Sequence, residues 1–307
     1  MLLKKVIKKI EIVMSKILIP PISNLFAFSL KKFTTPYEKV FYVASTGRSG
    51  TDSLSKLFEV IPNFYSTHEP KPAMNDFEMI EKNNGNAIPM KKLYHNSKSN
   101  MIRLGQLKHK KYYLEANHIF IKGFIEEVVE DFGDKLEVIH LYRDPVKVAK
   151  SILELQRVPS TARGNEWYLD YKAKNNIIQI EDELNSNDDF KHDYYKCLWY
   201  WYEIEARTFF YRNKYRTIRF IDFKTENLNN YDDIVSLLNK LEITYDSETI
   251  KSIVGIKHNQ KKSNKTELLS SEAAEEMHEN FKKMLNSKGF IDPEFDKNSM
   301  PVFKLET

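Results

Sequence analysis

The sequence contains little cysteine and no long hydrophobic run. Its only cysteine, Cys197, excludes an intrachain disulfide framework and a cysteine-rich zinc site, and no other spacing of His or carboxylate residues suggests a metal. The longest uncharged run, residues 17–30, contains two prolines and is shorter than the roughly 18 residues of a membrane-spanning helix. With only a weak cleavage candidate at residues 27–29, we expect no signal peptide and a cytoplasmic protein without a metal.

Positive charge is concentrated at the N-terminus. Residues 1–32 carry seven lysines and one glutamate, so the rest of the chain has a net charge of −2 within a total of +4. This balance argues against nucleic-acid binding by the main body. Apolar residues recur at helical spacing through residues 3–18 with lysines between them, which predicts a basic amphipathic segment over residues 1–35. Two interpretations stay open: residues 1–30 lie peripherally on an anionic membrane surface, or the helix docks on protein.

Short apolar runs alternate with helical patterns through the rest of the 307 residues. This order predicts an α/β fold with a mainly parallel sheet flanked by helices on both faces. The polar segments 74–111 and 156–193 are expected at the surface, and no linker divides residues 36–307. The expected strands are 40–44, 63–68, 112–115, 135–142 and 217–222, and the expected helices are 52–60, 120–132, 145–155, 194–215 and 231–243.

The stretch "FYVASTGRSGTDSLSKLF", residues 41–58, has the strand, glycine turn and helix of a phosphate-binding P-loop. It lacks the Gly-Lys-Ser/Thr that an ATP-binding P-loop carries. Gly47 and Gly50 let the backbone approach an anion closely, and the helix N-terminus attracts negative charge. The hydroxyls of Ser49, Thr51 and Ser53 are further donors. A glycine turn before an ordinary helix is the alternative for this pattern alone.

A second stretch, "VIHLYRDPVKVAKSI", places Arg143 at the end of an expected strand and Ser151 two helical turns later. Open α/β sheets bind ligands at the carboxyl ends of their strands, and an arginine there can hold a phosphate through two hydrogen bonds. The alternative is an arginine paired with Asp144 and a serine packed on a helix.

Together, "TGRSGTDSL" and "LYRDPVKVAKS" resemble the two nucleotide motifs of the sulfotransferase family, whose enzymes use 3′-phosphoadenylyl sulfate (PAPS). The resemblance covers roughly residues 40–265 and is greatest to carbohydrate and bacterial branches with a "GRSGT" loop. It implies the P-loop NTPase-like sulfotransferase fold. It also implies transfer of a sulfuryl group from PAPS, with adenosine 3′,5′-bisphosphate as product and no metal.

The resemblance implies a role for each motif residue. Arg48 takes the place of the catalytic basic residue, and the 3′-phosphate is assigned to Arg143 and Ser151. A basic loop with Lys261 and Lys262 is expected to close over the same phosphate. Asp52 departs from the family pattern, which often has threonine there, and we expect its carboxylate to point away. The 5′-phosphate is assigned to Gly47, Arg48, Ser49, Gly50, Thr51 and Ser53.

A general base must accept the proton of the acceptor hydroxyl. Glu69, in "FYSTHEPKP", is the first candidate because several relatives carry a glutamate there. His118 is the second, and His68 is the third or serves to orient the acceptor. Glu115 and Asn117 are expected to line the cleft. A lone histidine is more often structural than catalytic, and an exposed glutamate in a turn is the alternative for Glu69.

These features predict a PAPS-dependent sulfotransferase that acts by in-line displacement on a hydroxyl-bearing acceptor. The polar surface segments and Trp167, Tyr168 and Tyr171 suit a carbohydrate or glycolipid. Two other functions stay open: a P-loop kinase or other NTP-using enzyme, and a non-catalytic nucleotide-binding protein associated with a membrane. The aromatic helix at 194–215, with Cys197 within it, is expected to form core.

Overall fold

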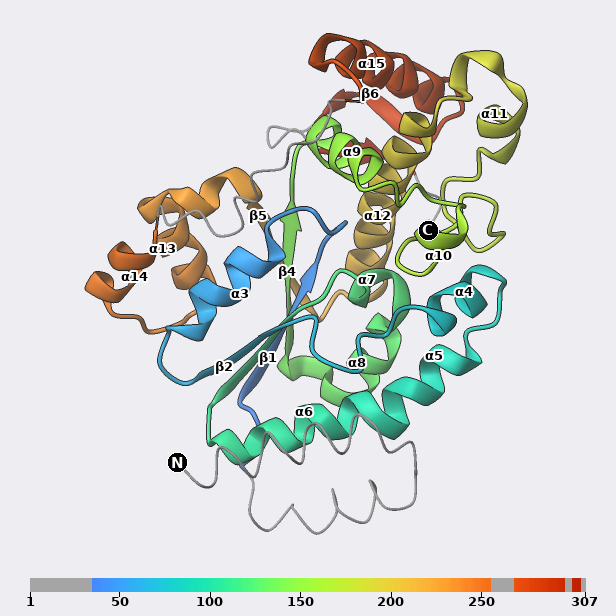
Figure 1. Cartoon of the computed structure of the whole chain (residues 1–307). Coiled ribbons are helices and arrows are strands. Elements are labelled where there is room, and N and C mark those ends of the chain that lie inside the picture. The colour runs from blue at the N-terminus through green and yellow to red at the C-terminus, as the bar shows by residue number, and fades with distance from the viewer. Residues whose placement is uncertain (1–34, 255–267, 296–299, 305–307) are drawn as a thin grey trace.

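A five-stranded parallel sheet organises the protein (Figure 1). A computed structural model describes residues 35–254, 268–295 and 300–304. The strand order is β2-β3-β1-β4-β5, and every neighbouring pair is parallel. The predicted mainly parallel sheet is therefore confirmed. The strands are β1 (Lys39–Ala44), β2 (Phe64–His68), β3 (Tyr112–Ala116), β4 (Leu136–Tyr142) and β5 (Arg219–Lys224).

Both faces of the central strand are buried. Along β1, Tyr42 and Ala44 belong to one hydrophobic cluster, whereas Phe41 and Val43 belong to a second. Successive side chains of a strand point to opposite faces, so the sheet lies between two apolar layers. A nearly continuous apolar strand is what a parallel sheet covered on both sides requires.

Helices cover the sheet on both sides (Figure 1). On one side lie α3 (Thr51–Glu59), α13 (Tyr231–Lys240) and α14 (Ser247–Ile253). The other side is covered by α7 (Phe120–Gly123), α8 (Ile125–Phe132), α9 (Pro145–Glu154) and α12 (Asp193–Lys214). The helix expected at 120–132 is divided, because Phe124 adopts a non-helical φ of −144° between α7 and α8. Short 3-10 turns follow α8 (Gly133–Lys135) and β5 (Thr225–Asn229).

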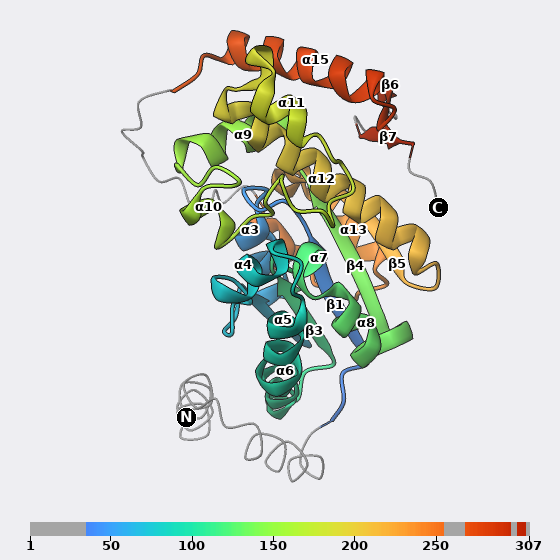
Figure 2. The same ribbon diagram turned by 90° about the vertical axis from the view of Figure 1, so that its right-hand side faces the viewer.

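The segment expected at the surface, residues 74–111, is more ordered and more buried than its polar composition suggests. It forms a succession of short helices along one side of the molecule (Figure 2). Tyr94, Lys98 and Ile102 from this segment are almost completely buried. The elements are α4 (Phe77–Asn83), α5 (Ile88–Leu93), a π-helical turn (Tyr94–Lys98), α6 (Ser99–Gly105) and a 3-10 turn (Gln106–Lys108).

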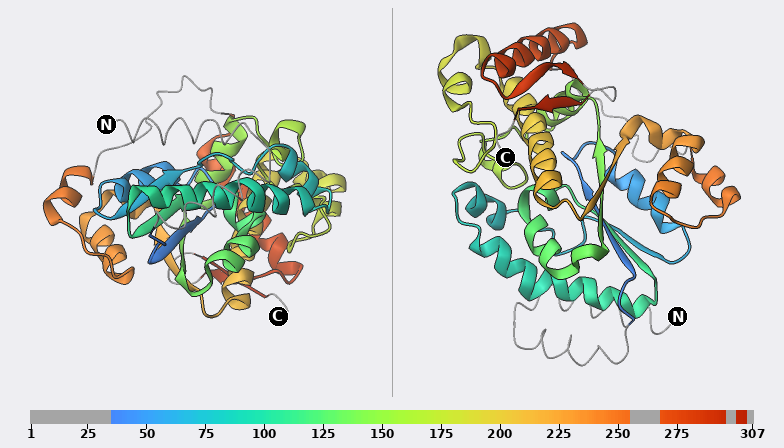
Figure 3. Two further views of the ribbon diagram at one scale, coloured as in Figure 1. Left: turned by 90° about the horizontal axis from the view of Figure 1, so that it is seen from below. Right: turned by 180° about the vertical axis from the view of Figure 1, so that it is seen from behind.

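The second polar segment contains α10 (Ala162–Asn165), α11 (Glu181–Ser186) and a 3-10 turn (Asp188–Phe190). Near the C-terminus, α15 (Ser271–Ser287) and the antiparallel pair β6 (Ile291–Phe295) and β7 (Pro301–Phe303) pack beside α12 (Figure 3). None of the helices in the described ranges has the length and apolar character needed to cross a bilayer. The basic N-terminal segment, residues 1–34, lies outside the described residues, and its boundary at residue 35 stays a prediction.

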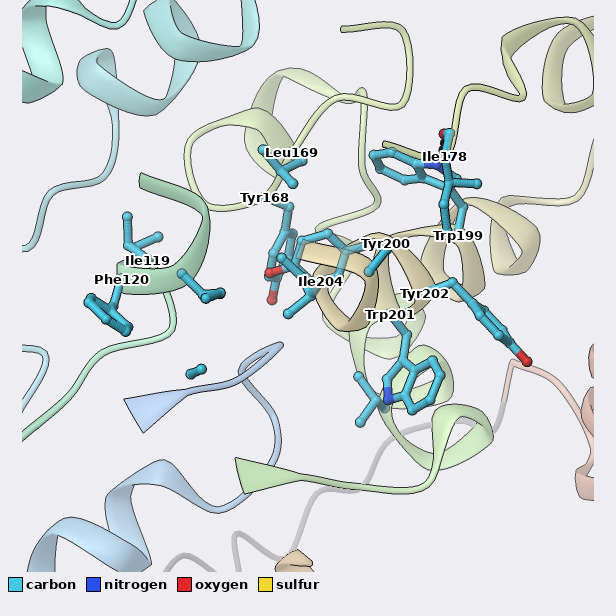
Figure 4. Close-up of a cluster of buried hydrophobic side chains, with 14 of the residues drawn as sticks. Ile119, Phe120, Tyr168, Leu169, Ile178, Trp199, Tyr200, Trp201, Tyr202 and Ile204 are labelled. Carbon is cyan, nitrogen blue, oxygen red and sulfur yellow. Dashed lines mark hydrogen bonds between the residues drawn. The ribbon is translucent and has the colours of Figure 1, made fainter. Parts of the chain in front are cut away.

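Four consecutive aromatic residues of α12 connect separate parts of the fold. Trp199, Tyr200, Trp201 and Tyr202 are completely buried, as is Cys197, and they point in different directions from the helix (Figure 4). The aromatic helix is core, as the sequence predicted. Each of the four also hydrogen-bonds another segment: the Ile178 carbonyl (2.8 Å), the Thr46 carbonyl (3.0 Å), the Arg143 carbonyl (2.9 Å) and His278 Nε2 (2.9 Å), respectively.

Candidate active site

The loop between β1 and α3 has the shape of an anion-binding turn. Gly47, Arg48 and Gly50 have φ values of 75°, 59° and 77°, in the left-handed region that glycine occupies without strain. Gly50 is the N-cap of α3, and no side chain caps the first N–H groups of this helix. These groups and the positive end of the helix dipole are therefore available to a phosphate.

The two predicted nucleotide motifs are in direct contact. The Arg143 guanidinium donates to the Arg48 carbonyl oxygen at 2.8 Å, and Arg48 Nε donates to Ser151 Oγ at 3.0 Å. The parallel pairing of β1 with β4 brings both strand ends to one edge of the sheet. Residues nearly 100 positions apart in the sequence thus form one basic surface.

A cavity of about 390 Å³ opens beside these arginines. It receives side chains from the loop, from the end of β2, from the turn after β3, from the end of β4 and from the segment after α9. The lining residues are Gly47, Arg48, Gly50, Thr51, Asp52, Ser53, His68, Glu69, His118, Arg143, Leu155, Arg157, Trp167 and Tyr168. The cavity therefore contains all three candidate bases together with most of the predicted phosphate ligands.

Glu69 lies between the two histidines. Its Oε1 is 3.6 Å from His118 Nε2 and 3.9 Å from His68 Nε2. Glu69 follows β2 with a φ of 44°, and its amide continues the strand pairing by donating to the Ala116 carbonyl. His68 Nε2 lies 3.1 Å from Thr51 Oγ1, which connects the histidine to the first turn of α3.

His118 is held as a neutral imidazole. Burial lowers its pKa well below the usual 6.5, and the nearby Lys122 lowers it further. Lys122 Nζ lies 3.0 Å from His118 Nδ1 and also donates to the Tyr200 hydroxyl at 2.5 Å. When Lys122 donates to Nδ1, the ring proton is on Nε2 and faces Glu69. At 3.6 Å from Glu69 Oε1, this N–H is beyond normal hydrogen-bond distance of the carboxylate.

Aromatic side chains complete the wall behind His118. Its ring is nearly parallel to that of Trp167, at 6.1 Å between centroids and 17° between planes. Tyr168 lies against Tyr200 at 4.7 Å (Figure 4). Gly47 packs against His118 on the loop side, since a Cβ atom there would lie 3.1 Å from His118 Cγ. The imidazole is therefore fixed between the loop and the aromatic wall.

Several predicted residues have other surroundings than expected. The Ser49 hydroxyl is buried and donates to the Gly47 carbonyl within the loop, so only the Ser49 backbone remains for an anion. Asp52 lines the cavity but forms an ion pair with Lys56 at 2.8 Å. The Tyr171 hydroxyl bonds Asn185 and is not part of the cavity. Lys261 and Lys262 lie outside the described residues.

The expectation that Glu115 and Asn117 line the cleft is wrong. Glu115 is fully buried and forms an ion pair with buried Lys98 at 2.6 Å. The Asn117 amide donates to Glu115 at 3.0 Å. Glu115 on β3 and Asn117 just after it are two positions apart, so both point to the same side of the sheet, where both are fully buried. They belong to the structure that supports the site.

Three residues near the cavity were not singled out from the sequence. Lys122 is four residues after His118, a spacing that puts both on one helical face. Leu155 and Arg157 come just after α9; Leu155 was expected to end the helix at 145–155, and Arg157 lies in the polar segment expected at the surface. No cluster of three or more potential metal ligands occurs in the described part of the chain.

Comparison with known protein families identifies one that covers most of the chain. A family model described as "Sulfotransferase domain" matches residues 38–302. No curated protein matches the chain. A solved sulfotransferase, STF9 from Mycobacterium avium, is 12% identical and has a TM-score of 0.48, over 82% of this chain and 77% of that one.

Two further solved structures are similar at the same level. A sulfotransferase from Alicyclobacillus acidocaldarius is 12% identical, with a TM-score of 0.43 over 83% of this chain and 93% of that one. The sulfotransferase domain from the curacin biosynthetic pathway is 10% identical, with a TM-score of 0.40 over 78% of this chain and 83% of that one.

Proposed function

This chain belongs to the sulfotransferase domain family, and we propose that it transfers a sulfuryl group from PAPS to the hydroxyl of a carbohydrate or glycolipid. The observation that carries the proposal is the contact between the two arginine motifs beside a cavity that contains a carboxylate. An ATP-binding P-loop needs a lysine and a metal-binding hydroxyl for its β- and γ-phosphates. A phosphosulfate has less charge at this position, which suits a loop with one arginine.

PAPS suits the charged groups and the hydrogen-bond donors of the site. We assign the 5′-phosphate to the loop backbone from Gly47 to Thr51, with the hydroxyls of Thr51 and Ser53. We assign the 3′-phosphate to Arg143 and Ser151. The left-handed turns at Gly47 and Gly50 leave space for this close approach, because neither residue has a Cβ.

In the proposed reaction, Glu69 accepts the proton of the acceptor hydroxyl. The hydroxyl oxygen forms a new bond to sulfur as the bond between sulfur and the bridging phosphate oxygen breaks. The electron pair of the broken bond leaves on that oxygen, giving adenosine 3′,5′-bisphosphate. Arg48 stabilises the negative charge that develops there, and His118 lies beside Glu69.

The donor assignment is tested by calorimetric titration with adenosine 3′,5′-bisphosphate, AMP, ADP and magnesium-ATP. We expect selective binding of the bisphosphate, at least tenfold weaker in Arg143→Ala because a charge-assisted phosphate contact is lost. Arg216→Ala, at an exposed arginine outside the cavity, is the matched control. Preference for ATP, or affinity that does not depend on the 3′-phosphate, would overturn the proposal.

The chemical step is tested with Arg48→Ala. We expect kcat to fall by about 10²–10³, the usual cost of removing one group that stabilises developing charge. Bisphosphate binding should weaken but stay measurable, because the loop backbone is intact. Unchanged turnover in this variant would contradict the assigned role of Arg48.

A further inference from the structure

Arg157 lies in the cavity without an acidic partner. Within the described residues it takes part in no ion pair or hydrogen bond, although it lines the same cavity as Arg48 and Arg143. Its guanidinium carbon is 5.1 Å from the centroid of the Trp167 ring. Stacking on an aromatic face uses the plane of the guanidinium and leaves its in-plane N–H groups free.

The backbone around Arg157 is held in a costly conformation. Gln156 and Ser160 have φ values of 54° and 69°, and a non-glycine residue in this region costs of order 1–3 kcal/mol. Gly164 packs so closely that a Cβ atom would lie 1.9 Å from the Val158 carbonyl oxygen. Thr161 Oγ1 donates to the same oxygen at 2.7 Å. The turn that presents Arg157 is therefore fixed by its surroundings.

The other side of the turn is anchored just as firmly. Asp170 accepts hydrogen bonds from Ser160 Oγ and from the Asn165 amide. Asn83, on α4, donates to the Tyr168 carbonyl at 3.0 Å and accepts from the Asp170 amide at 3.1 Å. Trp167 and Tyr168 are thus held against α4, and the stacked Arg157 is held with them.

The charges of the cavity leave Arg157 unassigned. Arg48 and Arg143 are matched to the donor, and Asp52 is paired with Lys56. Glu69 faces the two histidines, with its Oε1 3.6 Å from His118 Nε2. Arg157 is assigned to none of the donor's groups, so its guanidinium can bind a negative group on the acceptor.

We propose that Arg157, stacked on Trp167, is a subsite for an anionic group on the acceptor, so that the acceptor is an acidic sugar. A carboxylate matches the planar guanidinium with two parallel hydrogen bonds. This inference rests on the proposed sulfuryl transfer and adds the charge class of the acceptor. The reacting hydroxyl is then held near Glu69 while the carboxylate is held by Arg157.

The experiment compares 4-nitrophenyl β-D-glucuronide and 4-nitrophenyl β-D-galacturonide with the matching glucoside and galactoside. Binding to the full chain saturated with adenosine 3′,5′-bisphosphate is measured first, and transfer from PAPS second. We expect the acidic member of at least one pair to be favoured about tenfold or more. Arg157→Gln should reduce this preference by about tenfold, Arg157→Lys should restore part of it, and Arg163→Gln, on the exposed surface of α10, should leave it unchanged.

Three results would overturn the inference. One is equal handling of acidic and neutral sugars, and another is the absence of binding of either acidic probe. The third is a loss of bisphosphate affinity in Arg157→Gln as large as in Arg143→Ala, which would assign Arg157 to the donor. Since bisphosphate binding is measured separately, failure of the acidic-sugar inference is distinguishable from failure of the proposed function.

Discussion

The buried ion pair between Lys98 and Glu115 supports the candidate base from behind. The two side chains are 1% and 0% exposed, and their charged atoms are 2.6 Å apart. Lys98 Nζ also donates to the carbonyl oxygens of Pro70 and Pro72, at 2.9 and 3.3 Å. One ammonium therefore joins the helical segment, β3 and the turn that carries Glu69.

Lys98→Met should be among the most destabilising single substitutions in the protein. It leaves the Glu115 carboxylate buried without a counter-charge, which costs about 3–5 kcal/mol. With a urea slope of about 3 kcal/mol per M, the unfolding midpoint should fall by roughly 1–1.7 M. Glu115→Gln should cost less, because burial already lowers the pKa of Lys98 and lets the lysine lose its proton.

Urea denaturation of the two single variants and the double variant measures the coupling. We expect the double variant to be more stable than the sum of the single losses predicts. Lys91→Met is the matched control, since Lys91 belongs to the same helical segment but its pair with Glu130 is exposed, and its loss should be within about 0.5 kcal/mol. A loss below about 1 kcal/mol in Lys98→Met, or simple additivity, would refute the reasoning.

Four other substitutions test three separate parts of the structure. Gly47→Ala and Gly85→Ala both place a side chain at positive φ, costing about 1–2 kcal/mol of stability each, but only the first is crowded by His118. Bisphosphate affinity should therefore fall in Gly47→Ala alone, and equal losses in calorimetry would contradict this. Burial lowers the pKa of His140, but Glu205 and Asp222 raise it to about 9. The charged imidazole thus stabilises the fold fully below pH 6.5, and about 3 kcal/mol is lost as the pH rises to about 9. In His140→Gln the urea midpoint should not fall over this pH range. The same pH dependence in the variant and the wild type would contradict this role of His140. Tyr200→Phe removes the hydroxyl that accepts from buried Lys122 and donates to the Thr46 carbonyl of the loop. The free energy of unfolding measured in urea should therefore fall by about 1–3 kcal/mol. A variant as stable as the wild type would show that these hydrogen bonds do not stabilise the fold.

The strands and the positions of the two arginine motifs could be predicted because their signals are local. The apolar run of β1 and the glycines after it specify a strand and a turn within ten residues. Arg143 follows β4 in the same way. Once the sheet is parallel, its geometry brings both strand ends to one edge, so the pattern of strands and turns is sufficient to predict Arg48 and Arg143 side by side.

The supporting contacts could not be predicted, since they depend on residues distant in the sequence. Nothing near Lys98 indicates that its partner is Glu115, and the polar composition around both suggested a surface and a cleft. The orientation of Arg157 could not be predicted either, because it depends on a turn with two left-handed residues that follows no simple sequence rule. The proximity of Lys122 to His118 was partly predictable from their spacing of four residues. The contact between Lys122 and the Tyr200 hydroxyl was not, because Tyr200 is distant in the sequence.

The four aromatic residues of α12 make the length of this helix more critical than any one of its side chains. A substitution at Trp199 or Trp201 removes a single hydrogen bond and some packing. Inserting one residue before Trp199 would turn the following side chains by about 100° around the helix axis. All four hydrogen bonds would then be lost together. The helix would no longer connect the loop after β1, the end of β4 and α15 to one another. Insertions in relatives of this chain should therefore occur in the segments before and after α12 and not within the helix.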